Sequence, residues 1–442
     1  MKLAQPLDSF VDGTVNPADR LAEPVRLAYL VSEYPAISHT FILREVRHLR
    51  AQGFEIFPAS INAPRQVVTE MAAVDRDEAR RTFYIKPAGA AAAVRAHLAT
   101  FCKHPLAYLR GLGFALSLGG SDLRELVFSV FYFTEALLLG NWMRRHGLRH
   151  LHVHFINAAA TVGLITSRIF GTGFSLTVHG PDEFYDVCRL RLKEKIEGAA
   201  FVFCISQFAR SQLMKLVAVP HWSKLEVSRL GVDPRIFKPH PFRVAPSPLN
   251  LLCVGRLVPA KGQHVLIAAL DRLIRGGRSV TLRLVGDGPD RTSLEGEVAS
   301  RSLCSQISFT GSVNQDQIRQ LYGESDVFVL ASFAEGIPIV LMEAMAMEIP
   351  CVSTTVAGIS ELIRNEVDGL LVPPSDERAL AEAVERLIDD RELRRRLGQA
   401  ARRRILDQFD LDENVELLAR LFTARLTAGP HAATAPDRVV NT

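Results

Sequence analysis

The chain has 442 residues, of which 48% are hydrophobic and 23% charged, and its formal net charge is only +4. This length predicts two or three domains with sizeable apolar cores, and the composition excludes an intrinsically disordered chain. The weak positive charge gives no reason to expect a nucleic-acid partner.

Targeting and redox features point to the cytoplasm. Residues 1–24 are polar and carry three aspartates without an apolar run, so we expect an N-terminal tail and no signal peptide. Six cysteines are scattered along the chain, and none forms a C-x-x-C pair. This usage is typical of reduced thiols rather than a disulfide framework or a zinc site. Peripheral contact with the cytoplasmic face of the membrane stays open.

Strand-like and helix-like segments alternate between residues 25 and 240. The apolar run Val25–Val31 is followed by an amphipathic helix near Thr40–Gln52 and a strand near Glu55–Ser60. Further strands are expected at Leu151–Phe155, Phe174–Val178 and Phe201–Ile205. Alternation of this kind predicts a Rossmann-like domain with a doubly wound parallel sheet.

Residues 88–149 interrupt this alternation with an alanine-rich helical region. Its most apolar run, Leu126–Met143, contains Glu135 and Asn141, which disfavour a membrane-spanning helix. A buried helix is the main hypothesis, and a helix that touches the membrane or the acceptor is the alternative.

The second half repeats the pattern after a proline-rich linker. Five prolines lie between Asp233 and Asn250, and we place the linker at residues 241–248. A second Rossmann-like domain is expected over residues 249–408, a last helix over 409–426 and a disordered tail over 427–442. Its strands are expected near Leu249–Val254, Val280–Val285, Ile307–Phe309, Val327–Leu330 and Cys351–Ser353. The basic runs Arg394–Arg396 and Arg402–Arg404 are expected to be solvated helix faces.

The most informative segment, Phe333–Ile363, reads FAEGIPIVLMEAMAMEIPCVSTTVAGISELI. Its carboxylates Glu335 and Glu343 flank the start of an apolar helix, and Pro338 suits the first helical position. Gly336 lets the backbone approach a ligand, and free amides at a helix start bind phosphate. Two carboxylates beside a phosphate-binding site suit a sugar nucleotide, because its hydroxyls need hydrogen-bond acceptors and its diphosphate needs amide donors.

Other candidate residues follow predicted strands. Gly255, Arg256 and Lys261 come directly after a strand in VGRLVPAKG and can converge on one diphosphate, although a solvated loop is the alternative. His179 ends a strand before a Gly-Pro turn, which places it at the ligand-binding edge of its sheet. His152 and His154 share one face of a strand but lack an evident third ligand, so a core or cleft function is expected rather than a metal site.

Taken together, these motifs resemble glycosyltransferase family 4, a retaining group with the GT-B architecture of two domains facing across a cleft. Within it the chain resembles bacterial exopolysaccharide and colanic-acid-type enzymes, with which it shares a TFI-x-x-E pattern at Thr40–Glu45. The resemblance implies that Arg256 and Lys261 grip the donor diphosphate and that Glu343 accepts hydrogen bonds from the ribose. It also implies that Glu335 faces the transferred sugar and that His179 lies beside donor sugar and acceptor.

The resemblance places Gly255, Gly336, Ile337 and Pro338 among the donor-binding residues. The loop Ser32–Thr40 lacks the paired glycines that many family members carry, so Ser38, His39 and Thr40 either contact the diphosphate or cap the following helix.

The implied activity is transfer of a hexose from a nucleoside diphosphate sugar to a glycan acceptor, expected to be lipid-linked through a polyprenyl diphosphate. No metal or other cofactor is expected, because Arg256 and Lys261 can stabilise the leaving diphosphate. The alternatives are a sugar-nucleotide epimerase or phosphorylase of the same fold, and a non-catalytic sugar-nucleotide-binding scaffold.

Overall fold

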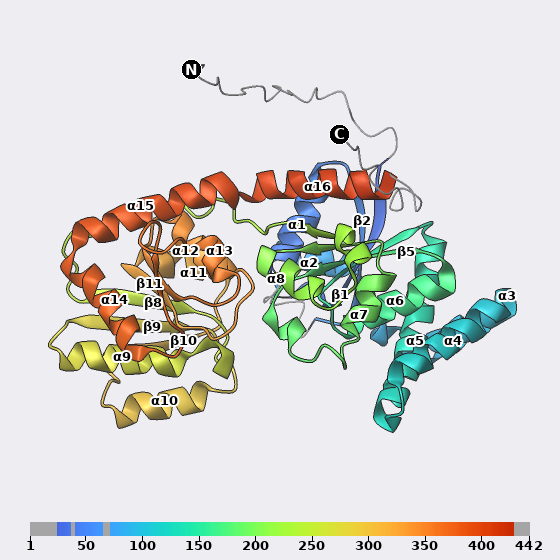
Figure 1. The fold of residues 1–442 in the computed structure, drawn as a ribbon, viewed down its shortest axis with the longest axis horizontal. Helices are drawn as coiled ribbons and strands as arrows, with labels where there is room; N and C mark the ends of the chain where they lie inside the picture. Colours follow the sequence, from blue (N-terminus) through green and yellow to red (C-terminus); the bar gives the residue numbers. More distant parts are fainter. Residues whose placement is uncertain (1–23, 37–39, 65–70, 428–442) are drawn as a thin grey trace, which may run out of the picture.

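The computed structural model describes residues 24–36, 40–64 and 71–427. They form two α/β domains, each built on a parallel sheet, which lie side by side in Figure 1. The first sheet has seven strands in the order β3-β2-β1-β4-β5-β6-β7, and the second has six in the order β10-β9-β8-β11-β12-β13. The predicted fold class is confirmed.

The first sheet comprises β1 (Arg26–Glu33), β2 (Glu55–Asn62), β3 (Phe83–Tyr84), β4 (His150–His154), β5 (Gly173–Val178), β6 (Phe201–Cys204) and β7 (Leu225–Val227). The second comprises β8 (Leu249–Val254), β9 (Val280–Val285), β10 (Ile307–Gly311), β11 (Val327–Leu330), β12 (Cys351–Thr354) and β13 (Leu370–Val372). The helices of the N-terminal domain are α1 (Thr40–Ala51), α2 (Ala73–Arg81), α3 (Gly89–Lys103), α4 (Pro105–Gly119), α5 (Leu123–Arg145), α6 (Ala158–Phe170), α7 (Leu192–Gly198) and α8 (Gln207–Met214). Those that follow are α9 (Gln263–Arg275), α10 (Arg291–Ser300), α11 (Gln315–Gly323), α12 (Ile339–Ala346), α13 (Ile359–Leu362), α14 (Glu377–Asp389), α15 (Arg391–Gln408) and α16 (Leu411–Thr427).

Each sheet has one point where the strand order reverses. In the first sheet β1 lies between β2 and β4, and in the second β8 lies between β9 and β11. Connections leave the sheet in opposite directions at such a point, so the loops after these strands open a crevice at their carboxyl ends. In the second domain these loops begin at Gly255, after β8, and at Ala331, after β11.

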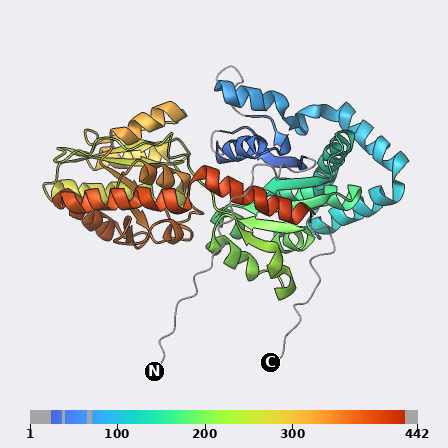
Figure 2. The same cartoon turned by 90° about the horizontal axis from the view of Figure 1, so that it is seen from above.

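The chain crosses between the domains twice, and the two crossings lie side by side. Val232 donates its N–H to the carbonyl of Phe409 at 3.0 Å, and Leu411 returns a bond to the carbonyl of Val232 at 3.0 Å. After this second crossing α16 runs along the N-terminal domain, as Figures 1 and 2 show. Its apolar face joins the core cluster that surrounds β1 and α1. The last helix therefore belongs to the first domain's core, which its position in the sequence does not reveal.

The prediction that the arginine runs are solvated is wrong for three of their members. Arg394 is only 2% exposed, and its guanidinium donates to the carbonyls of Leu387, Arg243 and Val244. Arg402 donates to carbonyls of Phe237 and Ala346, and Arg404 to those of Glu361 and Leu362. These carbonyls lie in or near the linker, or near the ends of helices, where backbone acceptors lack a partner, and the guanidinium donors from α15 satisfy them.

Helices α3, α4 and α5 extend away from the N-terminal sheet, at the lower right of Figure 1. By length and composition alone α5 could cross a membrane, but half of its most apolar window is buried in the domain. Phe133, Leu137 and Met143 are among its buried residues, whereas Leu123 and Phe131 are exposed. One part of the helix is thus a core element and another part is an exposed apolar surface. Both hypotheses from the sequence, a buried helix and a helix that touches the membrane or the acceptor, are compatible with this arrangement.

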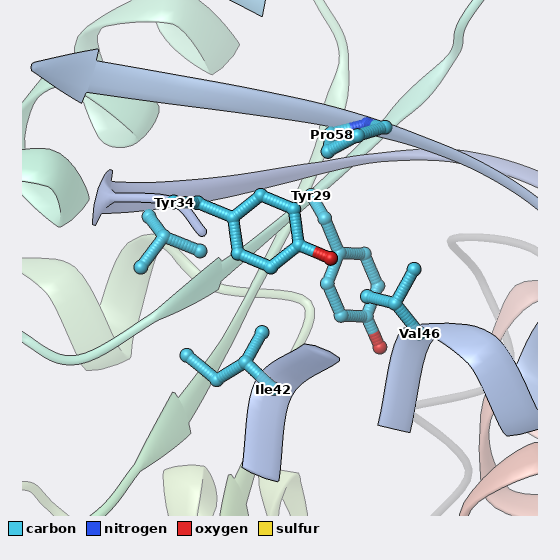
Figure 3. A pocket seen from close by; sticks show the side chains of 6 residues that line it. Tyr29, Tyr34, Ile42, Val46 and Pro58 are labelled. Atoms are coloured by element: carbon cyan, nitrogen blue, oxygen red, sulfur yellow. The ribbon is translucent and has the colours of Figure 1, made fainter. Parts of the chain in front are cut away.

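The face of the first sheet beneath α1 is packed with aromatic and branched side chains. Figure 3 shows Tyr29 and Tyr34 between the strands and Ile42 and Val46 of α1, with Pro58 of β2 beside them. The side chains of Tyr29, Tyr34, Ile42 and Val46 are each no more than 1% exposed. This packing fixes α1 against the sheet and so fixes the polar residues that α1 carries.

Three alternate residues of β4, His150, His152 and His154, share one face of the strand, and all three are buried. His150 and His152 share the hydroxyl of Ser175, at 2.7 and 2.8 Å, and His152 also contacts the hydroxyl of Thr177 at 2.8 Å. Burial lowers the pKa of His150 to about 4 and that of His152 well below its usual value. The expected core function of His152 is therefore confirmed by its contacts.

We expect this histidine strand to make the protein acid-sensitive. Unfolded His150 binds a proton near pH 6.5, whereas folded His150 does so only near pH 4. Between these values the unfolded state holds more protons, so lowering the pH favours unfolding. Between pH 7 and pH 5 the wild type should lose about 2 kcal/mol more unfolding free energy than His150→Gln. Urea denaturation at the two pH values measures this, with exposed His104→Gln as control. Equal pH slopes in wild type and His150→Gln would contradict it.

Candidate active site

The loops after β8 and β9 pack backbone against backbone. Leu257 donates its N–H to the carbonyl of Asp287 at 3.0 Å. A Cβ on Gly286 would lie 2.0 Å from the carbonyl oxygen of Gly255, and one on Gly288 would lie 2.2 Å from that of Leu257. Gly286 and Gly288 therefore allow the backbone after β9 to approach the backbone after β8 closely, and this contact holds the Gly255–Lys261 loop in place.

The loops after β8 and β11 meet at the reversal point of the second sheet. Phe333 donates its N–H to the carbonyl of Ala260 at 2.8 Å, and the Nζ of Lys261 lies 2.5 Å from Oε1 of Glu335. The hydroxyl of Ser332 donates to the same carboxylate oxygen at 2.7 Å. Two residues that the sequence places 74 positions apart thus form one partly buried ion pair.

Arg256 is the exposed cation of this group. Within residues 24–36, 40–64 and 71–427 its guanidinium has no hydrogen-bond or ion-pair partner, while its carbonyl accepts from Gln263 at 2.9 Å. Five N–H donors at the mouth of a strand-reversal crevice are well suited to a phosphate group.

Glu343 is buried in α12 and is contacted from both domains. Its Oε1 lies 3.3 Å from a guanidinium nitrogen of Arg44 on α1, and its Oε2 accepts from the hydroxyl of Tyr322 at 3.2 Å. Burial raises the pKa of Glu343, and the positive charge of Arg44 opposes this. In this structure the carboxylate therefore forms a salt bridge with an arginine of the other domain, and its hydrogen bonding to a ribose remains a prediction.

His179 follows β5 in the first domain and is 7% exposed. Its Nε2 lies 3.0 Å from Nδ1 of His154, and the rings of Phe155 and Phe41 lie 4.4 and 5.0 Å from its own. Aromatic packing and the contact with His154 therefore help to hold the imidazole.

Glu183 organises the turn that carries His179, and sequence reasoning missed it. Its carboxylate accepts the N–H groups of Ile156, His179 and Gly180 at 2.5, 2.5 and 2.8 Å. Burial raises the pKa of Glu183 to about 7, against the effect of these donors and of Lys195. The only trace in the sequence is an acid three residues after Gly180, a spacing found at helix starts.

The two domains touch at Gly336 and His179. A Cβ on Gly336 would lie 2.0 Å from the carbonyl oxygen of His179, and one on Gly358 would lie 2.1 Å from that of Gly336. Nearby, Glu361 of α13 accepts the N–H groups of Gln207 and Phe208 at the start of α8, at 2.9 and 2.7 Å. The structure thus brings two of the predicted residues, Gly336 of the second domain and His179 of the first, together at the domain interface.

The comparisons with known proteins agree with this geometry. The sequence profile described as Glycosyl transferases group 1 matches residues 238–404. The chain carries a glycosyl transferases group 1 domain. It is 28% identical over 375 residues to the putative colanic acid biosynthesis glycosyltransferase WcaL of Escherichia coli K12, covering 81% of this chain and 90% of that protein. It is 28% identical over 380 residues to the amylovoran biosynthesis glycosyltransferase AmsK of Erwinia amylovora, covering 82% and 90%.

Solved structures share the whole two-domain arrangement. Anabaena Alr3699/HepE in complex with UDP-glucose has a TM-score of 0.69 at 19% identity, over 90% of this chain and 99% of that one. Sucrose-phosphate synthase of Thermosynechococcus elongatus has a TM-score of 0.70 at 20% identity, over 91% and 100%. At these identities the likeness concerns the fold, which is GT-B.

Several other residues predicted for the site have a defined position in the structure. Ile337 is buried, and Pro338 precedes α12 rather than forming its first residue, because its ψ of 120° is extended. Thr40 is the first residue of α1, whereas Ser38 and His39 lie outside the described residues, as do the tails 1–23 and 428–442. Among the described residues, no group of three or more His, Cys, Asp or Glu side chains could hold a metal ion.

Proposed function

We propose that this protein is a retaining, metal-independent hexosyltransferase that uses a nucleoside diphosphate sugar and acts in exopolysaccharide or other surface-glycan synthesis. The observation that carries the proposal is the grouping of Arg256, Lys261 and Glu335 at the strand-reversal point of the second sheet, beside the interface with His179. The names of WcaL and AmsK support the pathway class, and the UDP-glucose complex of HepE supports the donor class.

The donor diphosphate would meet two cations in different states. The guanidinium of Arg256 is exposed, whereas Lys261 is engaged by Glu335 at 2.5 Å. A diphosphate therefore has to draw the ammonium away from Glu335 or share it, and this leaves Glu335 able to accept hydroxyls of the transferred sugar. Both cations would stabilise the charge that develops on the departing nucleoside diphosphate.

The ribose and the sugar would occupy opposite ends of α12. Glu343 already accepts the Tyr322 hydroxyl and faces Arg44, so ribose hydroxyls would replace or join these partners. His179 would contact a hydroxyl of the sugar or acceptor from the other domain. Retention without an assigned nucleophile is consistent with front-face displacement, in which a phosphate oxygen of the donor takes the acceptor proton.

The exposed apolar side chains of α3, α4 and α5 support a lipid-linked acceptor at a membrane surface. They comprise Val94, Leu98, Phe101, Leu106, Leu109, Leu123, Val127, Val130 and Phe131. We expect the protein to co-sediment with anionic vesicles and Leu106→Asp/Phe131→Asp to release most of it. Equal sedimentation of both proteins would remove the membrane contact from the proposal.

The central experiment measures the melting temperature with UDP, GDP and ADP, using Lys261→Met and Glu343→Gln for comparison. A diphosphate at 100 times its Kd should add about 2.7 kcal/mol of stability. The sugar nucleotides of the stabilising base are then assayed for transfer to lipid-linked glycans, with and without EDTA, and the product anomer is determined by NMR.

We expect one base to stabilise the wild type, transfer to proceed in EDTA, and the anomeric configuration to be retained. An inverted product would exclude the retaining mechanism, and EDTA inhibition reversed by Mg²⁺ would exclude metal independence. Stabilisation without transfer to any acceptor would favour the non-catalytic scaffold.

A further inference from the structure

The amides at the start of α8 are capped from both domains. Ser206, the N-cap residue, accepts the N–H of Ala209 on its hydroxyl oxygen at 3.0 Å. The N–H groups of Gln207 and Phe208 donate to the two carboxylate oxygens of Glu361, at 2.9 and 2.7 Å. Glu361 lies on α13 of the second domain, 154 positions further along the chain than Gln207. A helix end of the first domain is therefore capped by a side chain of the second, where α13 and α8 lie next to each other in Figure 1.

This cap depends on how the two domains are oriented. A carboxylate that accepts backbone N–H groups at a helix start is stabilised both by its charge and by the helix dipole. Each oxygen of Glu361 meets a different N–H, so the carboxylate fits the end of α8 in one orientation. Opening of the cleft would break both hydrogen bonds together. The cap therefore favours one arrangement of the domains over more open ones.

The short helix that carries Glu361 also packs against the candidate site. Its N-cap residue is Gly358, on which a Cβ would lie 2.1 Å from the carbonyl oxygen of Gly336. A Cβ on Gly336 would in turn lie 2.0 Å from the carbonyl oxygen of His179. The guanidinium of Arg404 on α15 donates to the carbonyl of Glu361 at 2.9 Å and so holds α13 from its other side. The cap on α8 and the contact between Gly336 and His179 thus belong to one continuous interface.

We propose that Glu361 is a positioning residue that, by capping α8 across the interface, holds the domains in the arrangement in which Gly336 meets His179. The inference rests on the proposed function, in which transfer takes place between the donor loops of the second domain and the first domain. Glu361 acts through the arrangement of the domains, because its side chain bonds to α8, whereas the donor-binding candidates follow β8 and β11.

The first test measures the separation of the domains in the full-length protein without substrate. Cys188 in the first domain and Cys304 in the second are exposed and accept spin labels, once Cys102→Ser has removed the third exposed thiol. Double electron–electron resonance then gives the distribution of distances between the labels. With Glu361 intact we expect one dominant distance. In Glu361→Ala the distribution should broaden and show a second population, because open arrangements no longer sacrifice the two hydrogen bonds.

Ser206→Ala is the matched control, because it removes a cap of the same helix that lies within the first domain. It should lower the melting temperature and leave the distance distribution unchanged.

Gln207→Pro tests the contact from the side of α8. Proline has no N–H to donate to Glu361, but it suits the first helical position. The preceding residue, Ser206, is already extended at φ −150° and ψ 158°, as a residue before proline has to be. Because the N–H of Phe208 remains, Gln207→Pro should change the distribution less than Glu361→Ala. Added to Glu361→Ala, it should change nothing further.

Transfer kinetics provide a second readout. Arg256, Lys261 and Glu335 lie on the second domain, so the Kd of the stabilising nucleoside diphosphate should stay nearly the same in Glu361→Ala. The value of kcat should fall about 10- to 100-fold, because the arrangement that performs transfer is less populated. Glu361→Gln keeps one acceptor oxygen for α8 and should recover part of kcat. A residue that only stabilises the fold would lower the melting temperature without this separation of kcat from Kd.

An unchanged distance distribution in Glu361→Ala would overturn the inference, and so would an equal change in Ser206→Ala. A normal kcat in Glu361→Ala with an altered distribution would also overturn it, because transfer would then not need this arrangement. If Glu361→Ala does not fold, an unchanged distribution in Gln207→Pro overturns the inference instead. Because the distances are measured without substrate, a wild type that transfers no sugar would refute the proposed function and not the capping of α8 by Glu361.

Discussion

Arg256→Ala is expected to lower the rate of sugar transfer by about 10²- to 10³-fold, as removal of one preorganised donor to a developing charge does elsewhere. The melting temperature of the free protein should not change, because the guanidinium is exposed and has no partner among the described residues. Stabilisation by the nucleoside diphosphate should be much reduced. Transfer kinetics and melting temperatures with and without the diphosphate measure both effects.

Lys261 allows a second test at the same diphosphate. Lys261→Met should also abolish most transfer. It leaves Glu335 buried with Ser332 as its one remaining partner in the described part of the chain, so a lower melting temperature is expected as well. Lys261→Arg keeps the charge and should restore stability more than activity. Arg283→Ala, which removes an exposed ion pair with Glu324 in the same domain, is the control. Full activity in Arg256→Ala would show that the donor diphosphate does not bind at this loop.

The sequence was sufficient for the parts of the site that depend on local pattern. Apolar runs such as LLCV and VFVL mark strands buried on both faces, and polar residues directly after them must lie at the ligand-binding edge. The positions of Arg256, Lys261 and Glu335 follow from this rule. Their grouping also needs β8 and β11 to be neighbours, which the doubly wound pattern implies.

Contacts between distant segments could not be predicted in this way. Arg44 and Glu343 are 299 positions apart, and nothing near either residue indicates the other. Arg394 sits in a run of arginines that has the composition of a solvated face, yet it is buried because the linker carbonyls of Arg243 and Val244 need donors. The apolar face of α16 is visible in the sequence, but its partner, the N-terminal sheet, is not.

Gly336→Ala is expected to reduce transfer by at least about 10²-fold while the nucleoside diphosphate still binds. The added Cβ would lie 2.0 Å from the carbonyl oxygen of His179, so the domains cannot keep their present contact. A shift on the order of 1 Å between reacting groups is enough for a loss of this size. Arg256 and Lys261 lie on the same domain as Gly336, so the diphosphate site itself should survive. Transfer kinetics and diphosphate-dependent melting temperatures separate the two effects.

The matched control lies on the opposite side of the same contact. A Cβ on Gly180 would meet Gly336 atoms at 3.4 Å, an ordinary contact, and its extended backbone (φ 179°) suits any residue. Gly180→Ala should therefore retain most activity although it changes the same interface. Gly358→Ala, whose Cβ would lie 2.1 Å from the Gly336 carbonyl, should behave like Gly336→Ala. If Gly336→Ala were fully active, the contact between His179 and Gly336 would not belong to the state that performs transfer, and His179 would reach its substrate in a different arrangement of the domains.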